Sequence, residues 1–143
     1  MEITIRRLGP EDAAAVLASE GVFDHPCRPD QTRAFLSRDD HVLVGAFDGA
    51  RMVGMASGMV LLHPDKAPAF FVSEVGTAES HRKRGIASRL VALLLETARG
   101  LGCEGIWLAT EADNAAARAL YRRLAARETE GIVVYDWDGA MDG

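Results

Sequence analysis

The sequence is short of cysteine and of long hydrophobic runs. Its 143 residues include two cysteines, Cys27 and Cys103, which lie far apart with no CxxC pair and no histidine at a spacing suited to zinc. We therefore expect both thiols to be reduced and structural, and we expect no metal site. No apolar run approaches the roughly 20 residues that cross a bilayer, so we expect no membrane partner.

The chain also lacks an excess of positive charge. Its 16 basic and 21 acidic residues give a net charge of −5, which argues against general binding of nucleic acid through the phosphates. Residues 1–7 do not resemble a signal peptide, because their charges follow the apolar residues and no long apolar stretch comes next. Hydrophobic residues, at 48%, suffice for one core. These features predict a cytoplasmic protein with a single domain over residues 1–143.

Hydrophobic periodicity predicts an α/β (α+β) fold, with a mixed sheet of six to seven strands flanked by about four helices. The Asp48-Gly49 pair between two β-like runs predicts a hairpin. The predicted strands cover residues 3–6, 42–47, 52–62, 69–77, 105–110 and 132–137. The predicted helices start near Pro10, cover 30–37, run from Ile86 to Gly100, and cover 115–124.

The most informative segment is the basic loop between the strand over 69–77 and the helix that starts at Ile86. Three cationic residues, Arg82, Lys83 and Arg84, precede Gly85, which allows the backbone to approach a ligand closely. Free N–H groups and the positive dipole end of a helix favour an anion such as a pyrophosphate. Neither GxxxxGK[ST] nor GxGxxG after the first strand is present. A solvated charged turn is the alternative interpretation of this loop.

A second motif, Asn114-Ala115-Ala116-Ala117-Arg118-Ala119-Leu120-Tyr121, follows on a predicted helix. Asn114 and Tyr121 are two helical turns apart and share a face, although a capping asparagine and a core tyrosine would also explain them. Together with Arg82-x-x-Gly85-x-Ala87, this motif resembles the GNAT superfamily of N-acetyltransferases. That family has a [QR]xxGx[GA] acyl-CoA loop and a later Nxx[AS]xx[LF]Y helix, and the resemblance covers residues 70–124.

The resemblance implies acetyl transfer from acetyl-CoA to an amine by direct attack. It implies that Tyr121 is the acid for the leaving thiolate, since a phenol with a pKa near ~10 stays protonated at neutral pH. We predict Glu74 as the base, because burial in an apolar strand would raise its pKa. A carboxylate that faces solvent at a strand end is the alternative for Glu74. His81 is a lesser candidate, for which phosphate contact or plain exposure in the loop is the stronger expectation.

The donor site is expected around the end of the strand over 69–77 and the helix start that follows. Gly76 predicts a bulge that splays this strand, and a backbone N–H near residues 75–77 would donate to the thioester carbonyl. The predicted cofactor-binding residues are Val75, Gly76, Thr77, Arg82, Lys83, Arg84, Gly85, Ile86, Ala87, Ser88, Asn114 and Tyr121.

Within the superfamily, the chain is most similar to type I aminoglycoside 3-N-acetyltransferases, which confer antibiotic resistance. The similarity rests on the Ser80–Ala87 loop and on Tyr135-Asp136-Trp137-Asp138; it is weakened by Glu74 in place of aspartate and by Leu124-Ala125-Ala126 in place of a Leu-Gly turn. Two acid-rich segments, 9–30 and 128–143, would attract a polycation, unless they simply form a solubilising surface. The predicted substrate-binding residues are Asp24, Glu74, Glu111, Asp113, Asp136 and Asp138.

The motifs indicate the acyl donor but not the acceptor amine. Alternative acceptors are a polyamine, a peptide or protein N-terminus, and a small metabolite amine. A non-catalytic acyl-CoA-binding module is a further alternative, which the presence of Tyr121 and Glu74 disfavours. On the predicted last strand, Asp136 and Asp138 would face one side. Residues 133–137 of that strand could pair across a homodimer interface.

Overall fold

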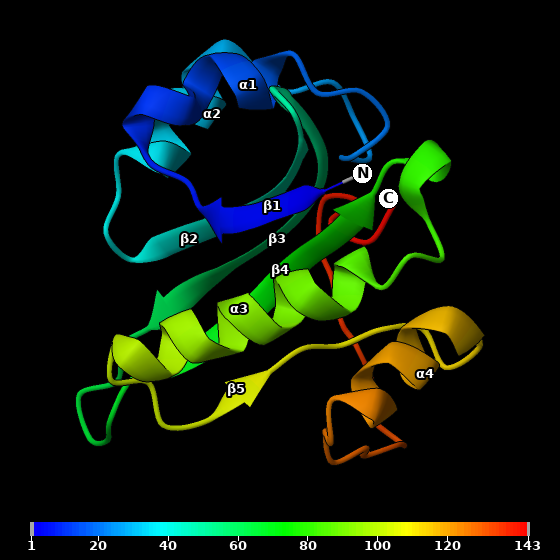
Figure 1. The fold of residues 1–143 in the computed structure, drawn as a ribbon. Coiled ribbons are helices and arrows are strands. Elements are labelled where there is room, and N and C mark those ends of the chain that lie inside the picture. Colours follow the sequence, from blue (N-terminus) through cyan, green and yellow to red (C-terminus); the bar gives the residue numbers. More distant parts are fainter. Residues whose placement is uncertain (1, 143) are drawn as a thin grey trace. The chain divides into compact units, whose positions relative to one another are not determined.

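The computed structural model describes residues 2–142, which form two compact units divided between Leu108 and Ala109. In the first unit five strands form one sheet in the order β1-β2-β3-β4-β5 (Figure 1). The first four strands pair antiparallel, and β4 pairs with β5 in parallel, so the sheet is mixed as predicted. The strands are β1 Ile3–Arg7, β2 His41–Asp48, β3 Arg51–Leu61, β4 Ala69–Thr77 and β5 Ile106–Trp107.

Helices cover both faces of this sheet. A 3-10 turn, η1 (Pro10–Asp12), leads into α1 (Ala13–Leu17), and α2 (Pro29–Leu36) follows after a loop. A second 3-10 turn, η2 (Glu79–His81), precedes the long helix α3 (Ile86–Gly100). A Cβ on Gly76 would meet the loop residue Val22, whereas a Cβ on Gly54, which pairs with Thr77, would meet α3. Because side chains alternate between faces along a strand, Gly76 and Thr77 face opposite sides of the sheet. The loop before α2 and the helix α3 therefore lie on opposite faces.

The core explains why β2 and β3 are hydrophobic almost throughout. Six consecutive residues of β2 and seven of β3 are buried, because helices cover both faces of the sheet. The largest fully buried side chains come from β3, β4 and α3 and include Phe70, Met52, Met55, Leu90 and Leu94. Cys27 and Cys103 are free thiols, and burial raises the pKa of each.

The second unit contains one helix, α4 (Ala115–Arg123). The Asn114 side chain caps it by accepting a hydrogen bond from the Ala117 N–H at 3.0 Å. At the other end Ala125 adopts a left-handed φ of 63°, the conformation that glycine would supply in the Leu-Gly turn of the family. Arg118 pairs with Glu128 and Glu130 and so joins the helix to the chain that follows it.

Two predictions about strands were wrong. The described sheet has five strands instead of six to seven, and β5 covers two residues instead of 105–110. Residues 132–137 form no strand, and Ile132, Tyr135 and Trp137 are each more than 70% exposed. Alternation and β-branched residues reflect local preference, but a strand exists only where a partner supplies the ladder of hydrogen bonds. The prediction that Asp136 and Asp138 face one side of this strand is therefore also wrong.

An ion pair fixes the start of α1 to β1. The Arg6 guanidinium donates two hydrogen bonds to the Asp12 carboxylate, at 2.8 and 3.1 Å, and the Gly9 N–H donates a third at 2.8 Å. Asp12 is 7% exposed. The hydrogen bonds from Arg6 lower the pKa of Asp12, although burial opposes them.

We expect Asp12→Asn to lower the free energy of unfolding by about 1–2 kcal/mol at pH 7, because a charge-assisted bond is lost while Arg6 keeps its charge. Since the folded pKa of Asp12 lies below its ordinary value of 3.8, the stabilisation is present above that value and is lost as pH falls through the folded pKa. Urea denaturation of both proteins from pH 7 to pH 2 measures this. Asp40→Asn, in the exposed Arg38–Asp40 pair, is the control and should change nothing measurable. A deficit of Asp12→Asn that stays constant to pH 2 would contradict the assignment.

Candidate functional site

A β-bulge on β4 lies at Ser73, immediately before Glu74. Ser57 of β3 pairs with Glu74 and the next residue, Gly58, pairs with Val72, so Ser73 is the additional residue. The sequence suggested a bulge at Gly76, but the bulge lies three residues earlier. A bulge bends the strand that carries it and re-aims the side chains beside it.

Beyond the bulge, β4 has one open edge. The Ala78 N–H donates to the Val53 carbonyl at 2.8 Å. Because backbone directions alternate in an antiparallel pair, the amides of Val75 and Thr77 point away from β3. On that side β5 pairs only with Phe70 and Phe71. In residues 2–142 the last residues of β4 thus present backbone N–H and C=O groups at an unpaired edge, suited to an extended ligand.

One side-chain oxygen beside this edge is buried without a partner among the described residues. The Thr77 hydroxyl oxygen has no hydrogen-bond partner within the described part of the chain. A buried hydroxyl without a partner costs free energy unless a ligand or water satisfies it. The Thr77 carbonyl accepts a hydrogen bond from the Arg82 guanidinium at 3.1 Å, which brings this basic side chain to the same edge.

The basic loop and the start of α3 form an anion site. Arg82, Lys83, Arg84 and Gly85 are exposed, and Gly85 adopts a left-handed φ of 76° as the N-cap of α3. The first helical hydrogen bond runs from the Arg89 N–H to the Gly85 carbonyl at 3.2 Å. The amides of residues 86–88 therefore have no partner inside the helix and are available to phosphate oxygens. Ile86 is 2% exposed, so it can offer only its backbone, not its side chain.

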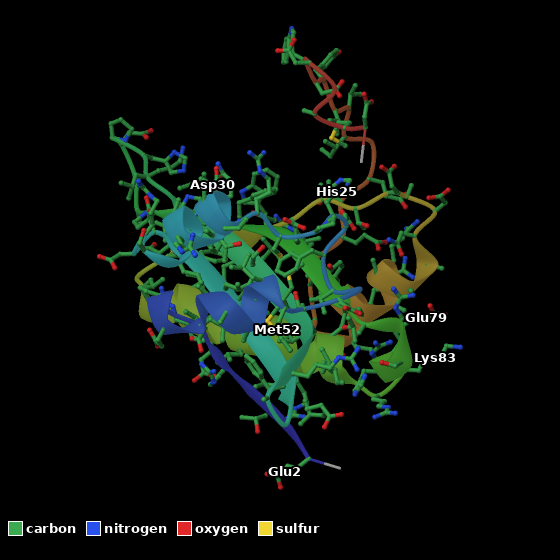
Figure 2. All side chains as sticks on the ribbon, turned by 90° about the horizontal axis from the view of Figure 1, so that it is seen from above. Glu2, His25, Asp30, Met52, Glu79 and Lys83 are labelled. Atoms are coloured by element: carbon green, nitrogen blue, oxygen red, sulfur yellow. The ribbon has the colours of Figure 1, made fainter. Side chains whose placement is uncertain are left out.

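Glu74 lies on the face of β4 opposite α3, near Asp24 and His25 of the loop before α2. The residue is exposed, yet partial burial of its carboxylate raises its pKa, the negative charge of Asp24 raises it further, and His25 lowers it in part. Phe23, Asp24 and His25 also line a pocket in this loop (Figure 2, where His25 is labelled). Glu74 and Asp24 are the predicted substrate residues that the structure brings together.

Gly76 lets this loop approach β4. A Cβ at Gly76 would overlap the carbonyl oxygen of Val22, so only glycine fits without a shift of the loop backbone. The close approach places the loop that carries Asp24 directly over the end of β4.

The remaining predicted residues belong to the second unit. Tyr121 lies on α4, and burial raises the pKa of its phenol, which stays protonated at neutral pH. Asn114 uses its side-chain oxygen to cap α4, as the simpler interpretation of the motif had it. Glu111 and Asp113 are exposed. Asp136 accepts a hydrogen bond from the Met141 N–H at 2.9 Å, and Asp138 adopts a left-handed φ of 56°.

The expectation for His81 was wrong. The side chain is neither exposed nor free to contact a phosphate, because it is buried and hydrogen-bonded to Asp48 and Ser80. Sequence reasoning interpreted Asp48 only as a turn residue. No signal in the chain connects two residues that are 33 positions apart.

Comparison with known proteins assigns this arrangement. Residues 12–126 match the acetyltransferase (GNAT) family. The chain belongs to this family. It is an acetyl-CoA-dependent N-acetyltransferase. Acetyl-CoA fits the open edge of β4, the Thr77 hydroxyl without a partner and the anion site at the start of α3.

Relatives in the family differ in their acceptors. The chain is 24% identical to aminoglycoside N(6')-acetyltransferase type 1 of Salmonella typhimurium, over 74% of this chain and 70% of that protein. It is 34% identical to the N-alpha-acetyltransferase RimI of Mycobacterium tuberculosis, over 84% of this chain and 75% of that protein. Among solved structures, the aminoglycoside acetyltransferase AAC(6')-Iy in complex with a CoA bisubstrate analogue superposes with a TM-score of 0.80 at 18% identity, covering 96% and 99% of the two chains. That last similarity concerns the fold.

No helix within residues 2–142 has the length and apolar character needed to cross a membrane. The same residues contain no group of three or more histidine, cysteine, aspartate or glutamate side chains placed to hold a metal ion.

We expect Gly76→Ala to lower the free energy of unfolding by about 1–3 kcal/mol, because the new methyl group displaces the Val22 backbone. The displaced loop should also reduce kcat/KM for the amine about tenfold or more at a temperature where the variant is folded. Thermal denaturation and steady-state kinetics measure both effects. The control is Gly100→Ala, where a Cβ has nothing within 4 Å. Equal behaviour of the two variants would contradict the close approach.

Proposed function

We propose that this acetyltransferase acts on a cationic small-molecule amine, most specifically an aminoglycoside. The observation that carries the proposal is the pair of carboxylates, Glu74 and Asp24, beside the end of β4, close enough for the Asp24 charge to raise the pKa of Glu74. Two carboxylates attract a substrate that bears more than one ammonium group. The relatives named for aminoglycoside acetylation support the same substrate class.

In the proposed mechanism Glu74 accepts the proton of the attacking ammonium group, and its raised pKa suits it to this role. The free amine then attacks the carbonyl carbon of the thioester, the acetyl donor that acetyl-CoA supplies. The Val75 N–H, at the open edge of β4, donates a hydrogen bond to the carbonyl oxygen as charge develops there. The C–S bond breaks as the C–N bond forms, and the departing sulfur takes a proton from the acid that the family motif implies, Tyr121. The acylated nitrogen loses its remaining excess proton to solvent, and the Tyr121 phenol regains its proton from solvent. Asp24 holds a second cationic group of the acceptor.

Two resemblances point to different acetylated positions on the aminoglycoside. The loop and the Tyr135–Asp138 segment resemble 3-N-acetyltransferases. The relative from Salmonella typhimurium is instead named for the 6'-amino group. We propose the 6'-amino group, because that similarity extends over 74% of the chain while the 3-N resemblance rests on short motifs.

A second candidate acceptor is the N-terminal amine of a protein. The 34% identity to RimI over 84% of the chain favours it. A peptide acceptor has one terminal ammonium group, so it gains less than an aminoglycoside from a pair of carboxylates.

The experiment that tests the proposal is thiol release from acetyl-CoA with kanamycin, spermidine and an alanyl peptide as separate acceptors. We expect release that depends on kanamycin, with kcat/KM at least tenfold above that for the peptide. Mass spectrometry and NMR of the product then identify the acetylated nitrogen. A preference for the peptide would contradict the aminoglycoside proposal and favour the RimI-like activity. Preference for spermidine would assign a polyamine acetyltransferase.

We expect Glu74→Gln to lower kcat/KM at pH 7 by about 10²-fold or more, because the amine then loses its proton only to solvent. In the parent enzyme the rate should fall as pH falls through the pKa of Glu74, which lies above its ordinary value of 4.5. In the variant, kcat/KM should instead rise with pH until the acceptor amine itself is deprotonated. Asp24→Asn is the comparison: it should raise the KM of the amine and move the fall in rate to lower pH, because the Asp24 charge helps to raise the pKa of Glu74. A Glu74→Gln profile parallel to that of the parent would contradict the role of the base.

We expect Tyr121→Phe to lower kcat by about 10²-fold with acetyl-CoA, because the leaving thiolate loses its proton donor. The raised pKa of Tyr121 keeps the phenol protonated throughout the assay range. A donor with a better leaving group, such as a thioester of an acidic thiol, should restore much of the loss. Full activity of the variant with acetyl-CoA would contradict the role of the acid.

A further inference from the structure

A buried histidine lies immediately before the basic loop. His81 ends the 3-10 turn η2, and its side chain is 7% exposed. Its Nε2 atom lies 2.9 Å from the Asp48 carboxylate, and its Nδ1 atom lies 2.7 Å from the Ser80 hydroxyl. Both ring nitrogens therefore have partners. With Nε2–H donating to Asp48, a neutral ring accepts the Ser80 hydroxyl proton at Nδ1.

The partner of this histidine is a rigid point of the sheet. Asp48 is the last residue of β2, where the hairpin to β3 turns. Its backbone pairs with Arg51 of β3 on one side and with Ile3 of β1 on the other. A residue held by two neighbouring strands has little freedom to move, so the Asp48 carboxylate offers a fixed anchor. The His81–Asp48 pair is 33 residues apart in sequence and joins η2 to this hairpin.

The loop after His81 has few contacts of its own. Arg82, Lys83, Arg84 and Gly85 are exposed, and Lys83 adopts a left-handed φ of 63°. Within the described part of the chain, the one side-chain hydrogen bond of these four residues runs from the Arg82 guanidinium to the Thr77 carbonyl. On the far side of the loop, buried Ile86 anchors α3 in the core. Figure 2 labels Glu79 and Lys83, which lie on either side of this histidine in the chain. The loop is thus fixed at its two ends rather than along its length.

We propose that His81 and Asp48 are positioning residues for acetyl-CoA. Their hydrogen bond holds the first end of the basic loop, so that the cations and the amides of residues 86–88 stay arranged around the pyrophosphate. A non-glycine residue with positive φ costs free energy and persists only where the surrounding structure holds it. The His81–Asp48 hydrogen bond supplies that constraint at one end of the loop. This inference rests on the proposed role of the loop as the pyrophosphate site.

The proposal separates the two halves of the acyl donor. A displaced loop weakens binding of the nucleotide and pyrophosphate, whereas Glu74 and the open edge of β4 act on the thioester end. A short donor without a pyrophosphate, S-acetyl-N-acetylcysteamine, should therefore be insensitive to loss of the His81–Asp48 hydrogen bond. A general loss of structure would affect both donors.

The test compares Asp48→Ala, His81→Ala, the double variant and Asp48→Asn with the parent enzyme. We expect each alanine variant to weaken CoA binding, measured by calorimetry, and to raise the KM of acetyl-CoA about tenfold, with kcat within about twofold. The double variant should be no weaker than the poorer single variant, because both remove the same interaction. Asp48→Asn, whose amide oxygen still accepts from Nε2–H, should recover most of the affinity. With the short donor, kcat/KM of every variant should stay within about twofold.

Two controls make each outcome decisive. Asp40→Ala removes the exposed Arg38–Asp40 pair, which has the same 2.9 Å length, and should leave CoA binding unchanged. The double variant Lys83→Ala/Arg84→Ala tests the loop itself. Unchanged CoA affinity in it would contradict the pyrophosphate site, independently of the role of the His81–Asp48 hydrogen bond. If the loop variant loses affinity while Asp48→Ala keeps it, the positioning role is wrong. An equal loss of kcat/KM with acetyl-CoA and with the short donor in the alanine variants would also contradict the positioning role. Should His81→Ala fail to fold, Asp48→Ala against Asp48→Asn applies the same comparison with folded protein.

Discussion

The structure depends on the point at which β4 loses its partner. β5 pairs with the first residues of β4 and then ends, while β3 continues beside β4 to Thr77. Backbone groups of Val75 and Thr77 therefore reach the end of the sheet without a strand to satisfy them on one side. The bulge at Ser73 sets which amides these are, because one additional residue reverses the alternation of everything after it. The donor site is a consequence of that unsatisfied edge.

The two reactants meet this edge from different sides. The anion site follows β4 in the chain and combines free amides at the start of α3 with three cationic side chains. The acidic pair consists of Glu74 on β4 and Asp24 in the loop before α2, which Gly76 allows to approach the strand. In the proposed function, a negatively charged donor and a positively charged acceptor are thus attracted to separate surfaces of one short strand segment. This separation of charge lets a net negative chain bind an anionic cofactor.

Sequence reasoning succeeded where the decisive forces are local. The bounds of β4 and α3 and the Asp48-Gly49 hairpin follow from periodicity, capping and turn chemistry, and the structure confirms them. It failed where distant residues decide. The apolar alternation of residues 132–137 cannot report that no ladder forms there, and the exposed position assumed for His81 ignored an anchor elsewhere in the sheet. The bulge was displaced from Gly76 to Ser73 because cross-strand register is not visible in one strand alone.

The most direct test of the donor site is an NMR titration of the ¹⁵N-labelled protein with CoA. The account predicts that the largest amide shifts fall on residues 75–77 and 83–88, the open edge of β4 and the start of α3. Amides around Asp39 and Asp40, outside both segments, should stay in place. Large shifts that avoid β4 and the start of α3 would contradict the account, because CoA would then bind at another surface of the molecule.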